Sequence, residues 1–248
     1  MALRRLLPDP GPTTIQEQLE SAGFAALAGD ERPYVFTNFV LTLEGRATLE
    51  GRSGPIGSAT DTAMLMGLRA EAEAVMIGAG TMRVERYGRV VPDAEARARR
   101  VRSGLAPDPL MVIVSGRLDL PWDAPLFTCG EGRVVIFTAA DADPPETATS
   151  LEVVRHEGTV DLTRALGALR RDHGIRALLC EGGPHLHAQL IEADLVDELF
   201  VTHAPKLAGG EGPHLVAGLT ERERPLEPAW LLHEEDTGEL FGRYRVIR

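Results

Sequence analysis

The sequence predicts a single α/β domain with a mostly parallel central sheet, helices on both faces of the sheet and a C-terminal antiparallel hairpin. Short apolar runs of strand length alternate with segments of helical spacing, which is typical of parallel sheets that are covered on both faces. Residues 231–234 and 240–246 flank an Asp-Thr-Gly turn, which predicts the hairpin. The sequence contains no internal repeat and no convincing linker, so one domain is expected.

The first third of the chain supplies two predicted helices and a strand. Prolines within residues 8–12 indicate a loose N-terminal arm. Thr14 and Glu17 form a capping box that predicts a helix up to about residue 28. Residues 34–43 are β-rich and mostly apolar, which predicts a buried strand, and a glycine-rich loop follows at residues 51–57. Ser58 and Asp61 mark the start of a second helix that ends near residue 72.

The remaining elements complete the alternation of strands and helices. Helical spacing of apolar residues predicts helices over residues 161–172 and 185–193. Apolar runs predict strands over residues 74–77, 110–114, 134–137, 151–155, 177–180 and 198–202.

Composition excludes several classes of protein. The 248 residues carry a net charge of -11, which argues against nucleic-acid binding because that function needs clustered lysine and arginine. We interpret the short basic run at residues 97–102 as a solvated face or loop. No stretch of about 18 apolar residues is present, so we expect no membrane span and a cytoplasmic protein. Cys129 and Cys180 are too few to form a zinc site.

Two glycine turns, at residues 78–81 and 181–184, each join an apolar strand to a helical segment. Glycine permits close approach of a ligand to the backbone, and the start of a helix offers unpaired N–H groups. Both turns are expected at the carboxyl edge of the sheet, where together they favour a phosphate-bearing ligand. Each turn alone is equally consistent with a tight turn that binds nothing. Neither turn is a Rossmann fingerprint, because Arg83 stands where the third glycine would be.

Polar residues beside these turns are candidates for chemistry. Glu44 follows the strand at residues 34–43, where a carboxylate with a raised pKa could relay a proton or bind a heterocycle; the alternative is a turn-forming acid before Gly45. Ser53 and Arg69 could grip a substrate phosphate, although arginine on a helix is also typical of a surface ion pair. No metal site is expected, since no clustered ligand motif occurs.

Seven sequence blocks occur in an order that resembles the reductase domain of riboflavin biosynthesis, the family of the C-terminal half of the bifunctional deaminase–reductase. The blocks are residues 38–46, 53–58, 68–70, 77–81, 181–186, 195–199 and 204–210. The resemblance places residues 1–31, an arm and a helix, outside a reductase domain of residues 32–248. The zinc deaminase motifs, His-x-Glu and Pro-Cys-x-x-Cys, do not occur.

The resemblance implies a dihydrofolate-reductase-like fold, a homodimer and NADPH as the cofactor. It implies reduction of a ribosylamino-pyrimidine phosphate at C1 of the sugar, which gives the ribitylamino product. With Glu44 as the catalytic candidate, the expected substrate-binding residues are Asn38, Ser53, Arg69 and Glu181. The expected cofactor-binding residues are Thr42, Pro55, Gly78, Gly80, Thr81, Glu85, Gly182, Gly183, Pro184, His185 and Leu186.

Two departures from the family pattern leave alternatives open. Glu44 stands where the family commonly has aspartate, and residues 86–90 read Arg-Tyr-Gly-Arg-Val in place of an Asp-Pro-x-Leu-Thr-x-Arg segment, so that Tyr87 or Arg89 could substitute. The alternatives are a diverged reductase of another pyrimidine or pterin-like heterocycle and a non-catalytic nucleotide- or flavin-binding module. Arg83 and Arg86 are both candidates to bind the 2′-phosphate of NADPH, because both lie close to the first glycine turn.

Overall fold

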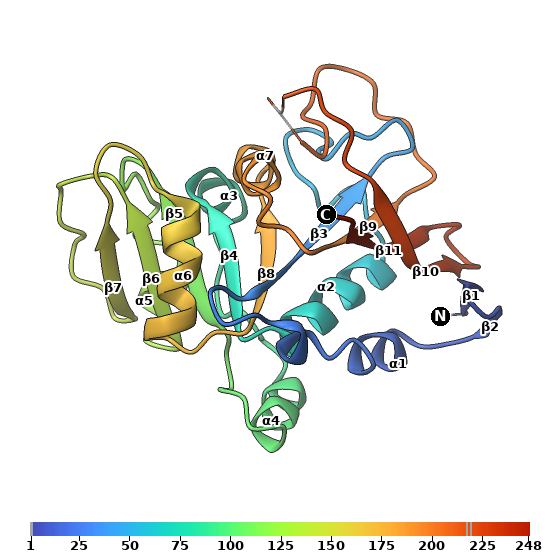
Figure 1. The fold of residues 1–248 in the computed structure, drawn as a ribbon, viewed down its shortest axis with the longest axis horizontal. Helices are drawn as coiled ribbons and strands as arrows, with labels where there is room; N and C mark the ends of the chain where they lie inside the picture. Colours follow the sequence, from blue (N-terminus) through green and yellow to red (C-terminus); the bar gives the residue numbers. More distant parts are fainter. Residues whose placement is uncertain (1, 217, 219) are drawn as a thin grey trace.

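The computed structural model describes residues 2–216, 218 and 220–248, which form one mixed sheet covered by helices (Figure 1). The strands are β1 (Leu3–Leu7), β2 (Gly11–Pro12), β3 (Tyr34–Leu41), β4 (Ala74–Gly78), β5 (Leu110–Ser115), β6 (Arg133–Thr138), β7 (Ser150–Arg155), β8 (Ala177–Gly182), β9 (Glu198–His203), β10 (Leu226–Glu234) and β11 (Leu240–Val246). The helices are α1 (Ile15–Glu20), the 3-10 turn η1 (Phe24–Leu27), α2 (Ala59–Glu71), α3 (Ala79–Glu85), α4 (Ala94–Arg102), α5 (Pro125–Thr128), α6 (Leu162–Asp172) and α7 (Pro184–Glu192).

The sheet has a parallel and an antiparallel part. In the described residues its strand order is β2-β1-β10-β11-β9-β3-β8-β4-β5-β6-β7, with β7 at one edge and β2 at the other (Figure 1). Strands β3 to β9 pair only in parallel with one another, whereas β11, β10, β1 and β2 continue the sheet in antiparallel pairs. The predicted mixed α/β domain with a C-terminal hairpin is therefore confirmed.

The parallel strands are buried on both faces. Along β4, Val75 and Ile77 pack in one hydrophobic cluster while Ala74 and Met76 pack in another, because successive side chains of a strand point to opposite faces. Helix α2 contributes to the first cluster, and helices α6 and α7 contribute to the second. This arrangement leaves the carboxyl ends of the parallel strands, and the loops that follow them, to build a site.

The N-terminal segment differs from the predicted loose arm. Residues Leu3–Leu7 form β1, which pairs antiparallel with β10, and Gly11–Pro12 pairs with β1. The capping box of Thr14 and Glu17 is present, but α1 ends at Glu20 and a separate 3-10 turn follows it. Pro8 and Pro10 lie in the connection between β1 and β2, and Pro12 lies in β2, the edge strand, where a missing N–H disrupts no interior pairing.

The basic run at residues 97–102 lies in α4, where Arg102 is exposed and Arg97 and Arg99 are partly exposed, as expected for a solvated face. The interpretation is wrong for Arg100, which is only 2% exposed. The Arg100 guanidinium donates to the backbone oxygens of Ala70 and Ala72, both at 2.7 Å, at the end of α2. Carbonyl groups at a helix end have no partner within the helix, so a buried arginine satisfies them here.

Candidate active site

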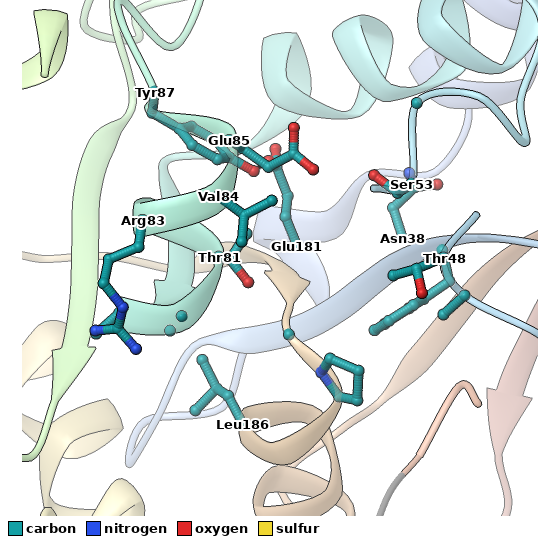
Figure 2. Close-up of a pocket in the computed structure, with 18 of the residues that line it drawn as sticks. Asn38, Thr48, Ser53, Thr81, Arg83, Val84, Glu85, Tyr87, Glu181 and Leu186 are labelled. Atoms are coloured by element: carbon teal, nitrogen blue, oxygen red, sulfur yellow. The ribbon is translucent and has the colours of Figure 1, made fainter. Parts of the chain in front are cut away.

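A cavity of about 870 Å³ lies at the carboxyl ends of β3, β4, β5 and β8, and Figure 2 shows the side chains that surround it. Most of the residues that the sequence singles out line this cavity. They are Asn38, Ser53, Arg69, Gly78, Gly80, Thr81, Glu85, Glu181, Gly183, Pro184, His185 and Leu186. Thr42, Glu44, Pro55 and Gly182 are not among the lining residues.

The two glycine turns face each other across one side of the cavity. A Cβ atom on Gly183 would lie 3.0 Å from the hydroxyl of Thr81, and one on Gly78 would lie 3.7 Å from Cβ of Leu186. The first turn is shorter than predicted, because helix α3 begins at Ala79, directly after Gly78. Gly78, Gly80 and Gly183 line the cavity and so present bare backbone to it.

Helix α7 begins at the second turn. Gly183 is its N-cap residue, and among the described residues no side chain caps the N–H groups of the first helical turn. His185 and Leu186 in this turn line the cavity. Unpaired N–H groups and the positive end of a helix dipole suit an anionic group, so this wall of the cavity is complementary to phosphate.

Glu181, at the carboxyl end of β8, forms a closed cluster with two partners. Arg69 Nε donates to Glu181 Oε1 at 2.6 Å and Arg69 Nη2 donates to Oε2 at 2.7 Å. The Tyr87 hydroxyl donates to Oε2 at 2.6 Å, and the guanidinium carbon lies 5.2 Å from the centroid of the Tyr87 ring. Burial, followed by the Glu181 carboxylate, raises the pKa of Tyr87 well above its usual range, so the phenol stays protonated and can donate.

Asn38 and Ser53 both line the cavity, on the side away from Arg83 in the view of Figure 2. The amide oxygen of Asn38, on β3, is buried and has no hydrogen-bond partner among the described residues. A buried acceptor without a partner is costly, so this oxygen is suited to accept a hydrogen bond from a ligand.

The expectation of a raised pKa for Glu44 is wrong. Its Oε1 atom accepts hydrogen bonds from the backbone N–H groups of Ala208 at 2.6 Å and Gly209 at 2.8 Å. The bond from Gly209, with a further hydrogen bond from Thr42, lowers the pKa of Glu44 to about 2. The carboxylate therefore anchors the loop at residues 208–209, as expected for a structural acid after a strand, and it does not line the cavity.

Comparison with known proteins decides the family. Residues 33–234 match the model of the RibD C-terminal domain. The chain belongs to this family. It is 34% identical to the 2,5-diamino-6-ribosylamino-4(3H)-pyrimidinone 5′-phosphate reductase of Archaeoglobus fulgidus, and the match covers 72% of this chain and 83% of that protein.

Solved structures share the fold of this RibD C-terminal domain. A pyrimidine reductase-like protein of Corynebacterium diphtheriae has a TM-score of 0.79 and 24% identity, and the match covers 95% of this chain and 100% of that one. The riboflavin biosynthesis reductase of Saccharomyces cerevisiae has a TM-score of 0.68 and 16% identity, covering 94% and 99% of the two chains. At these identities the likeness shows the common fold.

Asp61 is a cavity residue of this RibD C-terminal domain that the sequence marked only as a helix cap. The Ser58 hydroxyl caps α2, accepting from Thr60 N–H at 3.0 Å, while Asp61 lines the cavity. Burial, together with the nearby Glu239 carboxylate, raises the pKa of Asp61 to about 6, against a lowering hydrogen bond from Thr202. No local sequence signal could have revealed this, because Thr202 and Glu239 are distant in the chain.

Two features are absent from the described residues. Among the described residues, no group of three or more His, Cys, Asp or Glu side chains is arranged to hold a metal ion. No helix in the same residues is both long enough and apolar enough to cross a membrane.

Proposed function

We propose that this chain is an NADPH-dependent reductase of riboflavin biosynthesis that acts on a ribosylamino-pyrimidine 5′-phosphate. Hydride would be delivered to C1 of the sugar, giving the ribitylamino product. The observation that carries the proposal is that one cavity combines two facing glycine turns with Asn38, Ser53 and Glu181. The names of the relatives, which are reductases of such a phosphate, support it.

The residues present fit a nicotinamide dinucleotide. A side chain on Gly183 would crowd Thr81, so the glycine keeps space open beside the uncapped start of α7. A cavity of about 870 Å³ is within the usual size for cofactor sites, roughly 300–1,000 Å³. Gly183, His185 and Leu186 would hold the pyrophosphate by backbone contact, and the bound nicotinamide supplies the hydride.

The remaining polar residues would bind and orient the substrate. Asn38 offers an acceptor without a partner among the described residues, and Ser53 offers a hydroxyl on the same side of the cavity in the view of Figure 2. Arg69 was expected to grip a phosphate, but its guanidinium is committed to Glu181. We therefore assign Arg69 and Tyr87 a positioning role, in which they hold the Glu181 carboxylate toward the substrate.

An assay of NADPH oxidation with the ribosylamino-pyrimidine phosphate tests the proposal. Turnover that yields the ribitylamino compound is the expected result. Absence of turnover by a protein that binds NADPH would contradict the proposed substrate.

A second candidate is a reductase of another pyrimidine or of a pterin-like heterocycle. The observation that favours it is Tyr87, which stands in the altered segment after Glu85 and brings a phenol ring to the cavity. A higher kcat/KM for a dihydropterin than for the ribosylamino-pyrimidine phosphate would support this candidate. Binding of either ligand without single-turnover hydride transfer would instead support a non-catalytic module.

The proposal also covers the location, oligomeric state and domain organisation of the enzyme. We propose a cytoplasmic homodimer that binds no nucleic acid, in which residues 32–248 are the catalytic unit and residues 1–31 are an extension of it. Analytical ultracentrifugation tests the dimer, and a sedimentation coefficient of a monomer at micromolar concentration would contradict it.

A further inference from the structure

Four arginines among the described residues line the cavity, and they differ in how firmly their partners hold them. Arg69 uses all three guanidinium nitrogens, two on Glu181 and one on the oxygen of Val90. Arg89 is also fully engaged, with Nε and Nη2 on Asp108 and Nη1 on Glu131. Neither guanidinium can meet a new anion without breaking several bonds.

Arg83 and Arg86, both near the end of α3, are held less firmly. The Arg86 guanidinium has an ion pair of 2.8 Å with Asp123, and its side chain is 47% exposed. The Arg83 guanidinium donates to the backbone oxygen of Asp119 at 2.8 Å, and its separation from the Asp119 carboxylate is 3.5 Å. Both side chains of the Arg83–Asp119 pair are exposed, at 47% and 75%, so solvent screens the pair and it holds Arg83 only weakly.

The position of Arg83 separates it from Arg86. Its Nη2 atom lies 4.0 Å from the place that a Cβ of Gly80 would occupy, so the guanidinium packs over the first glycine turn. Figure 2 shows Arg83 on the side of the cavity where Thr81 and Leu186 lie, away from Asn38 and Ser53. Arg86 follows the last residue of α3 and pairs with Asp123.

We propose that Arg83 binds the 2′-phosphate of the adenosine ribose and so selects NADPH over NADH. This inference rests on the proposed function, because it assumes that the glycine turns hold the cofactor pyrophosphate. A phosphate ester carries about -1.5 to -2 charges at neutral pH and accepts two parallel N–H bonds from a guanidinium. It can therefore displace the single, loosely held carboxylate of Asp119.

Titration of protein fluorescence with NADPH and with NADH tests the proposal without requiring turnover. The Arg83→Gln variant is expected to lose on the order of tenfold in NADPH affinity, with its NADH affinity within about twofold of the wild type. Arg86→Gln is the matched control, because this arginine has the same exposure and also pairs with one aspartate. It should leave both affinities within about twofold.

The Asp119→Asn variant sharpens the test. Removing the competing carboxylate should raise NADPH affinity roughly two- to threefold. NADH affinity should be unchanged, because NADH has no 2′-phosphate to compete with Asp119 for Arg83. Both Arg83 and Asp119 are exposed, so unchanged melting temperatures confirm that the variants are folded.

The possible outcomes are distinct. Equal loss of NADPH and NADH affinity in Arg83→Gln, or loss of NADPH affinity in Arg86→Gln alone, would overturn the assignment of Arg83. Wild-type protein that binds NADPH, with Arg83→Gln binding it equally well, would overturn this inference and leave the proposed function standing. Wild-type protein that binds neither nucleotide would overturn both.

Discussion

The cavity and the core beside β9 each contain a buried arginine–glutamate pair with the same geometry but different surroundings. Arg69 binds Glu181 through two nitrogens at 2.6 and 2.7 Å, and Arg243 binds Glu198 through two nitrogens, both at 2.9 Å. The Tyr87 hydroxyl donates to Glu181, and the Glu198 carboxylate contributes to the raised pKa of Tyr34.

The surroundings decide what each pair can do. Arg69 and Glu181 line an open cavity, whereas Arg243 lies over the rings of Phe24 and Phe200, at 5.4 and 5.6 Å, and is not among the lining residues. The first pair can orient a carboxylate toward a ligand. The second joins β9 to β11 within the core, so its contribution is to stability.

Replacing the glutamate of each pair by glutamine should give the largest difference in stability between the two regions. Glu198→Gln leaves the buried Arg243 guanidinium without its countercharge, and the free energy of unfolding should fall by about 3–5 kcal/mol. Glu181→Gln should cost less, about 1–2 kcal/mol, because Arg69 can bind water in the cavity. Urea unfolding measures both.

In kinetic measurements the larger effect should belong to Glu181→Gln, the variant with the smaller loss of stability. Glu181→Gln should raise the substrate KM and leave NADPH affinity unchanged, since Glu181 is assigned to the substrate side. Equal stability losses in the two variants, or a raised NADPH dissociation constant in Glu181→Gln, would remove the distinction between the pairs.

His187 shows what happens to a buried basic side chain without a carboxylate. Its ring is fully buried and stacks on Phe39 with centroids 4.3 Å apart, and its Nε2 atom has no partner among the described residues. Burial lowers the pKa of His187 to about 4 from an ordinary 6.5. The imidazole is therefore neutral at pH 7.

The lowered pKa of His187 predicts an acid-sensitive fold. Between pH 6.5 and 4 the unfolded chain binds the proton while the folded chain does not, so the free energy of unfolding falls as pH falls through this window. The loss should approach about 3 kcal/mol below pH 4. Unfolding curves of wild type and His187→Phe across this range measure the effect, since the variant should lack this part of the pH dependence; parallel curves would contradict it.

The glycine at the second turn should matter for cofactor binding and little for the fold. Gly183→Val places a branched side chain within about 3 Å of the Thr81 hydroxyl, so NADPH affinity should fall on the order of tenfold. Gly54→Ala is the control, because a Cβ there meets nothing within 4 Å although Gly54 also lines the cavity. Fluorescence titration that finds equal affinities in the two variants would contradict the placement of the pyrophosphate.

The parts of the molecule that could be predicted from the sequence depend on local signals. Apolar runs marked the parallel strands because these strands are buried on both faces, and two glycine turns marked the cavity because they follow such strands. Strand β1 was missed because its pairing with β10 depends on a partner more than 200 residues away along the chain. Propensity within residues 3–7 cannot reveal such a partner.

The chemistry of individual side chains was harder to predict, since it depends on partners from distant elements. Glu44 was expected to have a raised pKa, but two backbone N–H groups near residue 208 lower it. Arg69 was expected to face a phosphate, but Glu181 and Tyr87 enclose it. Arg100 was expected in solvent, but it is buried and its guanidinium donates to backbone oxygens at the end of α2.

Tyr87 and Tyr34 allow the most closely matched comparison of the Arg69–Glu181 and Arg243–Glu198 pairs. Burial is the main reason that the pKa of each phenol is raised, and the glutamate of its pair raises it further. Tyr87→Phe and Tyr34→Phe each remove the phenol hydroxyl near that glutamate. Both variants should therefore lose a similar free energy of unfolding, about 1–2 kcal/mol.

Only Tyr87→Phe should also change the kinetics. Without the phenol, one oxygen of Glu181 loses a donor and the carboxylate is held less rigidly, so the substrate KM should rise several-fold while NADPH affinity stays unchanged. Tyr34→Phe should leave the substrate KM unaltered, because its glutamate lies outside the cavity. A KM that rises equally in both variants would mean that general loosening of the fold explains the effect, whereas a rise confined to Tyr87→Phe would establish Tyr87 as a positioning residue for Glu181.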